Sequence, residues 1–130
     1  MPPHILVIDD QISLPRFIAM ELDAEGYHVS ISCDDIAELS AIRDLKPDLI
    51  ILNWELRSAS GFEILRQLKL DHSPAPVVVI TVEDERACYL PLELGIHTCL
   101  IKPFSMNDLL KAIEFNLKGK KQVLGCSACN

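Results

Sequence analysis

The sequence lacks several features that mark whole classes of protein. Its 130 residues contain no apolar run near the roughly 18 residues that cross a bilayer, and the N-terminus lacks a signal-peptide layout. Basic side chains are the minority, 12 against 19 acidic ones, and the net charge is −7. Because affinity for a phosphate backbone comes mainly from Lys and Arg, we expect no direct nucleic-acid binding by this domain. The sequence therefore predicts a cytoplasmic protein without membrane contact.

Cysteine usage gives no sign of a disulfide framework. The count of five is odd, and with no secretory signal it favours free thiols in a reducing compartment. Cys126 and Cys129 have the spacing of a redox motif or half a zinc site, but no second pair accompanies them. We interpret them as part of a dispensable tail. The four histidines show no metal-ligand spacing.

Apolar runs and segments of helical spacing alternate along the chain. Strands are predicted at 4–8, 27–32, 49–52, 77–80 and 97–101. Helices are predicted at 13–26, from Asp34 or Asp35 to 45, and at 60–68, 84–94 and 105–117, with Pro91 shortening or kinking the fourth. Ser105 and Asp108 form a capping-box pattern at the start of the last helix. This alternation indicates an α/β domain over 1–118, in which a parallel sheet has helices on both faces, and a linker or disordered tail over 119–130.

Polar side chains stand where the predicted strands end. These residues are Asp9, Asp10, Asn53, Thr81 and Lys102. Ligands of open α/β sheets bind just beyond the carboxyl ends of the strands, so this edge is the candidate site. Taken singly the signals are weak, since an acidic pair after a strand often caps the next helix.

The set resembles the receiver domain of two-component response regulators, and Lys102-Pro103 followed by Phe104 is the most specific match. The resemblance covers residues 4 to about 117. It implies the flavodoxin-like, CheY-like (βα)5 fold with strand order 2-1-3-4-5, and a cis peptide bond before Pro103. It also implies a role in phosphorelay signal transduction.

The resemblance assigns a role to each polar residue. Asp10 would bind Mg²⁺ directly and Asp9 through water, with the backbone carbonyl of Glu55 as a further ligand. The Thr81 hydroxyl would bond a phosphoryl oxygen, and Lys102 would supply a positive charge to it.

Asn53 occupies the position of the aspartate that receivers phosphorylate. A neutral amide is no nucleophile toward phosphorus, so no acyl phosphate is expected here. The pocket also loses a negative charge, which predicts weakened Mg²⁺ binding. The sequence indicates no other cofactor. An amide can donate hydrogen bonds to the acidic pair, which predicts a pocket fixed in one state without metal.

Other positions also depart from the family pattern. Arg57 stands where a proline is usual, and Cys99 stands where a switch tyrosine or phenylalanine is usual. A cysteine has no ring to move inward, so the usual readout of phosphorylation is not expected. Pro91 alters the helix that normally takes part in the output face.

The leading hypothesis is an atypical, or pseudo-receiver, domain that is not an enzyme and acts through protein contacts without phosphorylation. Its expected partners are a histidine kinase, an output domain or a second copy, bound at the face of the fourth helix, fifth strand and fifth helix.

Two alternatives stay open. One is an ordinary phospho-accepting receiver, such as that of a transcriptional regulator, with Asn53 engineered to mimic the unphosphorylated state. The other is a flavodoxin-like enzyme or cofactor binder. The loop at 9–13 argues against it, because it lacks the glycine-rich or hydroxyl-rich pattern that binds a phosphate group.

Overall fold

The computed structural model describes residues 2–11, 13–32, 44–55, 61–82, 96 and 98–118. Its strands are β1 (His4–Ile8), β2 (His28–Ser32), β3 (Leu49–Asn53), β4 (Val77–Thr81) and β5 (Thr98–Ile101), and its helices are α1 (Ser13–Ala24), α3 (Gly61–Leu70) and α5 (Met106–Lys118). The predicted helix at 84–94, most of the one ending at 45, and the tail at 119–130 lie outside these residues. So do Arg57, Pro91, Cys126 and Cys129.

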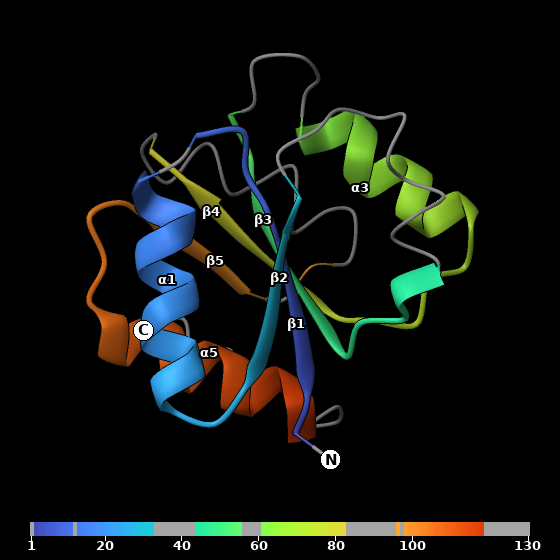
Figure 1. The fold of residues 1–130 in the computed structure, drawn as a ribbon. Coiled ribbons are helices and arrows are strands. Elements are labelled where there is room, and N and C mark those ends of the chain that lie inside the picture. Colours follow the sequence, from blue (N-terminus) through green and yellow to red (C-terminus); the bar gives the residue numbers. More distant parts are fainter. Residues whose placement is uncertain are drawn as a thin grey trace.

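The five strands form one parallel sheet in the order β2-β1-β3-β4-β5, as predicted (Figure 1). All five residues of β3 and of β4 are buried. Strands covered on both faces read as continuous apolar runs, which is why the sequence at 49–52 and 77–80 is unbroken Leu, Ile and Val. Each described strand lies within one residue of its predicted bounds.

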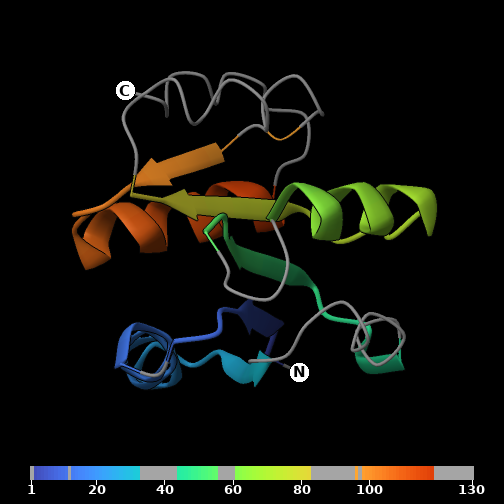
Figure 2. The same ribbon diagram turned by 90° about the horizontal axis from the view of Figure 1, so that it is seen from above.

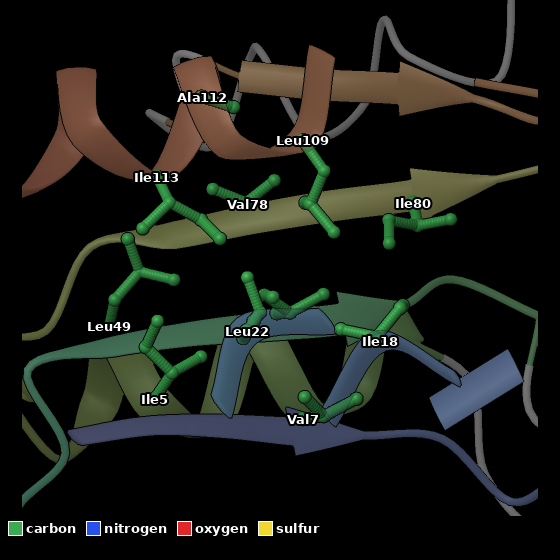
Figure 3. Close-up of a cluster of buried hydrophobic side chains, with 11 residues drawn as sticks. Ile5, Val7, Ile18, Leu22, Leu49, Val78, Ile80, Leu109, Ala112 and Ile113 are labelled. Atoms are coloured by element: carbon green, nitrogen blue, oxygen red, sulfur yellow. The ribbon is translucent and has the colours of Figure 1, made fainter. Parts of the chain in front are cut away.

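Helices cover the two faces of the sheet separately. Figure 2 shows α1 and α5 on one side and α3 on the other. Alternate strand residues point to opposite faces, so the strands supply two core clusters. The larger cluster, between the sheet and helices α1 and α5, is drawn in Figure 3 and comprises Ile5, Val7, Ile18, Leu22, Leu49, Ile51, Val78, Ile80, Leu109, Ala112 and Ile113. The cluster under α3 comprises Leu6, Ile8, Ile50, Leu52, Ile64, Leu65, Leu68, Val77, Val79 and Ile96.

Capping residues end α1 and begin α5 at the positions that the sequence predicts. Gly26 follows α1 with a φ of 95°, a conformation that costs other residues a Cβ clash. At the start of α5, the Asp108 backbone N–H donates to Ser105 Oγ at 3.0 Å and the Ser105 N–H to Asp108 Oδ2 at 3.4 Å. The predicted capping box is therefore confirmed. None of the helices in the described ranges is long and apolar enough to cross a membrane.

Two histidines pair at the amino-terminal edge of the sheet. His4 and His28 are register partners on β1 and β2, with ring centroids 4.6 Å apart. The His4 ring lies 2.8 Å from Ser30 Oγ, and its backbone N–H donates to Asp48 Oδ2 at 2.7 Å. Burial, and then repulsion from His28, lowers the pKa of His4 below its ordinary value of 6.5, while Asp48 acts in the opposite direction.

This arrangement predicts opposite shifts for two substitutions. His28→Gln removes a repulsive charge and should raise the pKa of His4, whereas Asp48→Asn should lower it further. Because the folded chain binds this proton less readily than the unfolded chain, the His4 contribution to stability is lost as the pH falls below about 6.5. NMR titration of the ring protons measures both shifts, and two shifts of the same sign would contradict the account.

Gly61 begins α3 in close contact with the end of β3. Its backbone N–H donates to the Trp54 carbonyl at 3.1 Å. A Cβ at this position would lie 2.7 Å from Trp54 Cε3, 2.8 Å from Trp54 Cα and 2.9 Å from the Trp54 oxygen. Two of these atoms belong to the backbone, so a rotation of the Trp54 ring does not make room.

We therefore expect Gly61→Ala to lower the free energy of unfolding in a urea titration. Overpacking of this kind costs about 1–3 kcal/mol, more than the helix propensity gained at a first helical residue. Adding Trp54→Ala removes only the ring atom and should not relieve the close contacts of the backbone. An unchanged unfolding midpoint for Gly61→Ala would show that the backbone shifts at no cost.

Candidate functional site

The register of the parallel strands brings the candidate residues together at one edge. Ile8 pairs with Leu52, which places Asp9 beside Asn53 one step further on. Asn53 pairs with Ile80, and the Trp54 N–H donates to the Ile80 carbonyl at 2.8 Å. The same offset of 27 residues places Glu55 beside Val82. The site is therefore made by the carboxyl ends of β1, β3 and β4.

The Asn53 side chain lies at the centre of this edge and is 3 % exposed. Its Nδ2 donates to Asp9 Oδ1 and to the Glu55 carbonyl oxygen, both at 3.1 Å. Both neighbours can only accept, so the amide must turn its NH₂ group toward them. An aspartate has no hydrogen to offer either group. The predicted hydrogen bond from Asn53 to the acidic pair is confirmed for Asp9.

Asp9 is buried, with 4 % of its surface exposed, and its charge is stabilised by donors from two segments. Oδ1 accepts from Asn53 Nδ2 and from the Gln11 backbone N–H at 3.0 Å. The Asp9 backbone N–H donates to the Ser32 carbonyl at 3.1 Å, which ties it to the end of β2. Asp10 follows, half-buried, at the same edge.

Glu55 contributes more to the site than its predicted backbone carbonyl. Its carboxylate accepts two hydrogen bonds: from Thr81 Oγ1 to Oε2 at 2.5 Å, and from the Val82 backbone N–H to Oε1 at 3.2 Å. Neither the spacing of the sequence nor the family resemblance predicts this role for the side chain. The signal that could have found it is the strand register, because an acidic side chain two residues beyond β3 lies opposite the residue that follows Thr81 on β4.

Thr81 and Lys102 meet through the backbone. Thr81 is fully buried at the end of β4, and the Lys102 N–H donates to its carbonyl at 2.8 Å. The Lys102–Pro103 peptide bond is cis, as predicted from the resemblance. The two residues thus stand at adjacent strand ends, and Thr81 also contacts the carboxylate of Glu55.

Cys99 differs from the expectation of a free thiol. It lies half-buried on β5, packed against the core cluster under α3, and it is disulfide-bonded. The prediction of free thiols is therefore wrong for this residue. An odd cysteine count and a missing signal peptide do not report which sulfurs the fold brings within bonding distance. The absence of an aromatic ring at this switch position is unaffected.

The residues around Asn53 offer oxygen ligands of the kind that Mg²⁺ prefers. Asn53 Oδ1 is buried and has no hydrogen-bond partner, so a cation or donor there would satisfy it. However, Nδ2 already lies between Asp9 Oδ1 and the Glu55 carbonyl oxygen, two groups assigned to the cation by the resemblance. Among the described residues, no three His, Cys, Asp or Glu side chains are grouped to hold a metal ion. The donor type suits Mg²⁺, but the amide must move to admit it.

Comparison with known proteins shows a consistent family likeness. The sequence model of the family described as the response regulator receiver domain matches residues 5–114. The DNA-binding response regulator MtrA of Mycobacterium tuberculosis is 32% identical over 119 residues, which cover 91% of this chain and 52% of that protein. The chain thus spans about half the length of the curated relatives it matches.

Solved structures agree with the fold. The chemotaxis protein CheY4 of Vibrio cholerae has a TM-score of 0.81 at 24% identity, and the match covers 90% of this chain and all of that one. Full-length FixJ from B. japonicum has a TM-score of 0.81 at 27% identity, over 89% of this chain and 58% of that one. The predicted flavodoxin-like CheY fold is therefore confirmed by the match to solved structures as well as by the strand order of the sheet.

The contacts of Asn53 predict a metal-dependent stability for Asn53→Asp. The new carboxylate loses both donated hydrogen bonds and faces Asp9 Oδ1, so in EDTA the free energy of unfolding should fall by about 1–3 kcal/mol. Mg²⁺ at millimolar concentration should restore more stability to this variant than to the parent. Urea titrations with EDTA or Mg²⁺ measure the difference.

Asn107→Asp is the matched control, because it adds the same charge at an exposed residue of α5. It should be almost neutral and indifferent to Mg²⁺. If Asn53→Asp equals the parent in EDTA, the two amide hydrogen bonds do not stabilise this edge.

Proposed function

We propose that this chain, which belongs to the family of response regulator receiver domains, is a pseudo-receiver that signals through protein contacts without being phosphorylated. In this proposal the domain performs no catalysis of its own. The pocket keeps one arrangement, and partner binding or protein abundance replaces phosphorylation as the input.

The observation that carries the proposal is the position of the Asn53 amide. Phosphorylation of a receiver needs a carboxylate nucleophile and a cation that gathers the surrounding oxygens. Here the NH₂ group of Asn53 donates to Asp9 Oδ1 and to the Glu55 carbonyl, and so it satisfies both oxygens with hydrogen bonds. The substitution removes the nucleophile. Its NH₂ group also contacts two oxygens that would otherwise face the cation.

The readout side of the domain supports the same proposal. Cys99 on β5 has no aromatic ring, and it is held in a disulfide. A receiver that answers phosphorylation by moving a ring inward at this position has no such ring to move here. Signal output that depends on a fixed surface needs no switch of this kind.

The proposed partners are a histidine kinase, an output domain or a second copy of this chain. The face expected to bind them includes β5 and α5, whereas the helix predicted at 84–94 lies outside the described residues. Because MtrA, a DNA-binding response regulator, is about twice as long as the matched region, contact with an output domain in a longer protein is one form of this proposal. We place the protein in the cytoplasm, where such partners act.

Intact mass after incubation with Mg²⁺ and a small-molecule phosphodonor tests the proposal. The parent chain should gain no phosphoryl group, because an amide does not attack phosphorus. Asn53→Asp should gain one if Asp10, Thr81 and Lys102 still form a working pocket. Asn107→Asp, with its new carboxylate on the exposed surface of α5, should stay unmodified.

Products must be sorted by their lability to hydroxylamine, since hydroxylamine cleaves an acyl phosphate and leaves phosphoesters intact. A labile phosphoryl group on the parent would overturn the proposal. If neither the parent nor Asn53→Asp is modified, the remaining residues do not support phosphoryl transfer, and the domain acts through contacts alone.

A further inference from the structure

The ends of β3 and β4 are joined by one carboxylate. Glu55 Oε2 accepts from the Thr81 hydroxyl and Glu55 Oε1 accepts from the Val82 backbone N–H. The two donors are Thr81, the last residue of β4, and Val82, the residue after it, and each contacts a different oxygen of the same group. Thr81 is fully buried, so its hydroxyl has little access to water.

A hydroxyl and a backbone N–H that converge on one carboxylate form an anion-receiving pair. Hydrogen bonds to an ionised acceptor are stronger than those between neutral groups, and a two-oxygen acceptor fixes direction as well as distance. Thr81 is the last residue of the buried strand β4 and Val82 follows it at the half-exposed edge, so the sheet sets the position of the hydroxyl and the chain direction sets that of the N–H. The pair has the form of an oxyanion receptor, and the carboxylate that it contacts comes from the same chain.

We propose that the Glu55 carboxylate is an internal ligand of this receptor and keeps the site permanently filled. The inference rests on the proposed function, because a pocket that receives no phosphoryl group from outside needs another anion to position Thr81. In this role Glu55 is a positioning residue, and the class of ligand that can replace it is a small oxyanion such as a carboxylate.

The backbone of the same residue strengthens this role. The Glu55 carbonyl accepts from Asn53 Nδ2 at 3.1 Å while its side chain accepts from Thr81 and Val82. Glu55 is thus held at both ends, by the amide that replaces the phosphoacceptor and by the receptor on β4. A carboxylate anchored in this way competes with a dissolved anion at a high effective concentration.

Rescue by acetate tests the proposal. Glu55→Ala removes the carboxylate that contacts Thr81 and Val82, and acetate carries the same charge and the same pair of oxygens as the deleted group. The Val82 amide proton, followed in ¹H–¹⁵N spectra, should move on substitution and should return toward its parent position as acetate is added, with saturation. The parent should respond at least about tenfold less to the same acetate concentrations.

Three controls keep the result specific. Chloride at matched ionic strength should not restore the Val82 signal. Glu21→Ala removes an exposed carboxylate from α1 and should leave the Val82 signal in place, with or without acetate. Glu55→Gln keeps the shape of the side chain but not its charge, so it should shift Val82 partway and resist rescue; it also serves if Glu55→Ala fails to fold.

An unchanged Val82 signal in both Glu55 variants would overturn the inference, and so would a parent that responds to acetate as strongly as Glu55→Ala. A Val82 signal that moves in Glu55→Ala without saturable recovery would also overturn it, since the receptor would then not accept an oxyanion. Acetate transfers no phosphoryl group. Failure here therefore stays distinct from failure of the proposed function, which a covalent mass increase on the parent would reveal.

Discussion

The geometry of the site depends on the register of three buried parallel strands. Each residue of β3 and β4 is enclosed between helices, and a slip of one position would turn every side chain to the opposite face. The two core clusters therefore fix how far each strand extends beyond its neighbour. Asp9 beside Asn53, and Glu55 beside Val82, are consequences of that offset. Positions in the polar edge are set by the packing of Leu, Ile and Val several residues away.

Hydrogen bonds from neutral donors stabilise the carboxylates at the polar edge of the sheet. Asp9 and Glu55 accept from the amide of Asn53, the hydroxyl of Thr81 and the backbone N–H groups of Gln11 and Val82. Buried carboxylates need such partners, because charge away from water is costly unless it is paired or hydrogen-bonded. A pocket that depends on a metal ion leaves these oxygens for the cation. Here these hydrogen bonds come from the chain itself, which supports the proposal that the site keeps its arrangement without a metal ion.

The sequence predicted the strands closely, because a buried strand is written as an unbroken apolar run and β3 and β4 are such runs. The strand order came from the family resemblance, since periodicity does not say which strands are neighbours. The Asn53–Asp9 contact followed from the chemistry of an amide beside an acid. The carboxylate of Glu55 was missed because its partners lie 26 and 27 residues away, across a register that only folding defines. The bonded state of Cys99 was mistaken for the same reason: cysteine spacing does not give distance in space.

Two side chains of the site, Asn53 and Thr81, act on a single residue, Glu55. Asn53 holds the backbone of Glu55 through Nδ2, and Thr81 holds its side chain through the hydroxyl. Because a carbonyl and a carboxylate of one residue lie only a few bonds apart, a change at either end alters the orientation of the other. The ends of β1, β3 and β4 are therefore linked through Asn53 and Glu55 into one hydrogen-bonded unit. In such a network each hydrogen bond polarises its neighbours, so a change at Asn53 or at Thr81 also alters the strength of the other residue's contact with Glu55. Under the proposed function, a unit linked in this way would hold the polar edge of the sheet in one constant form, with no change on phosphorylation.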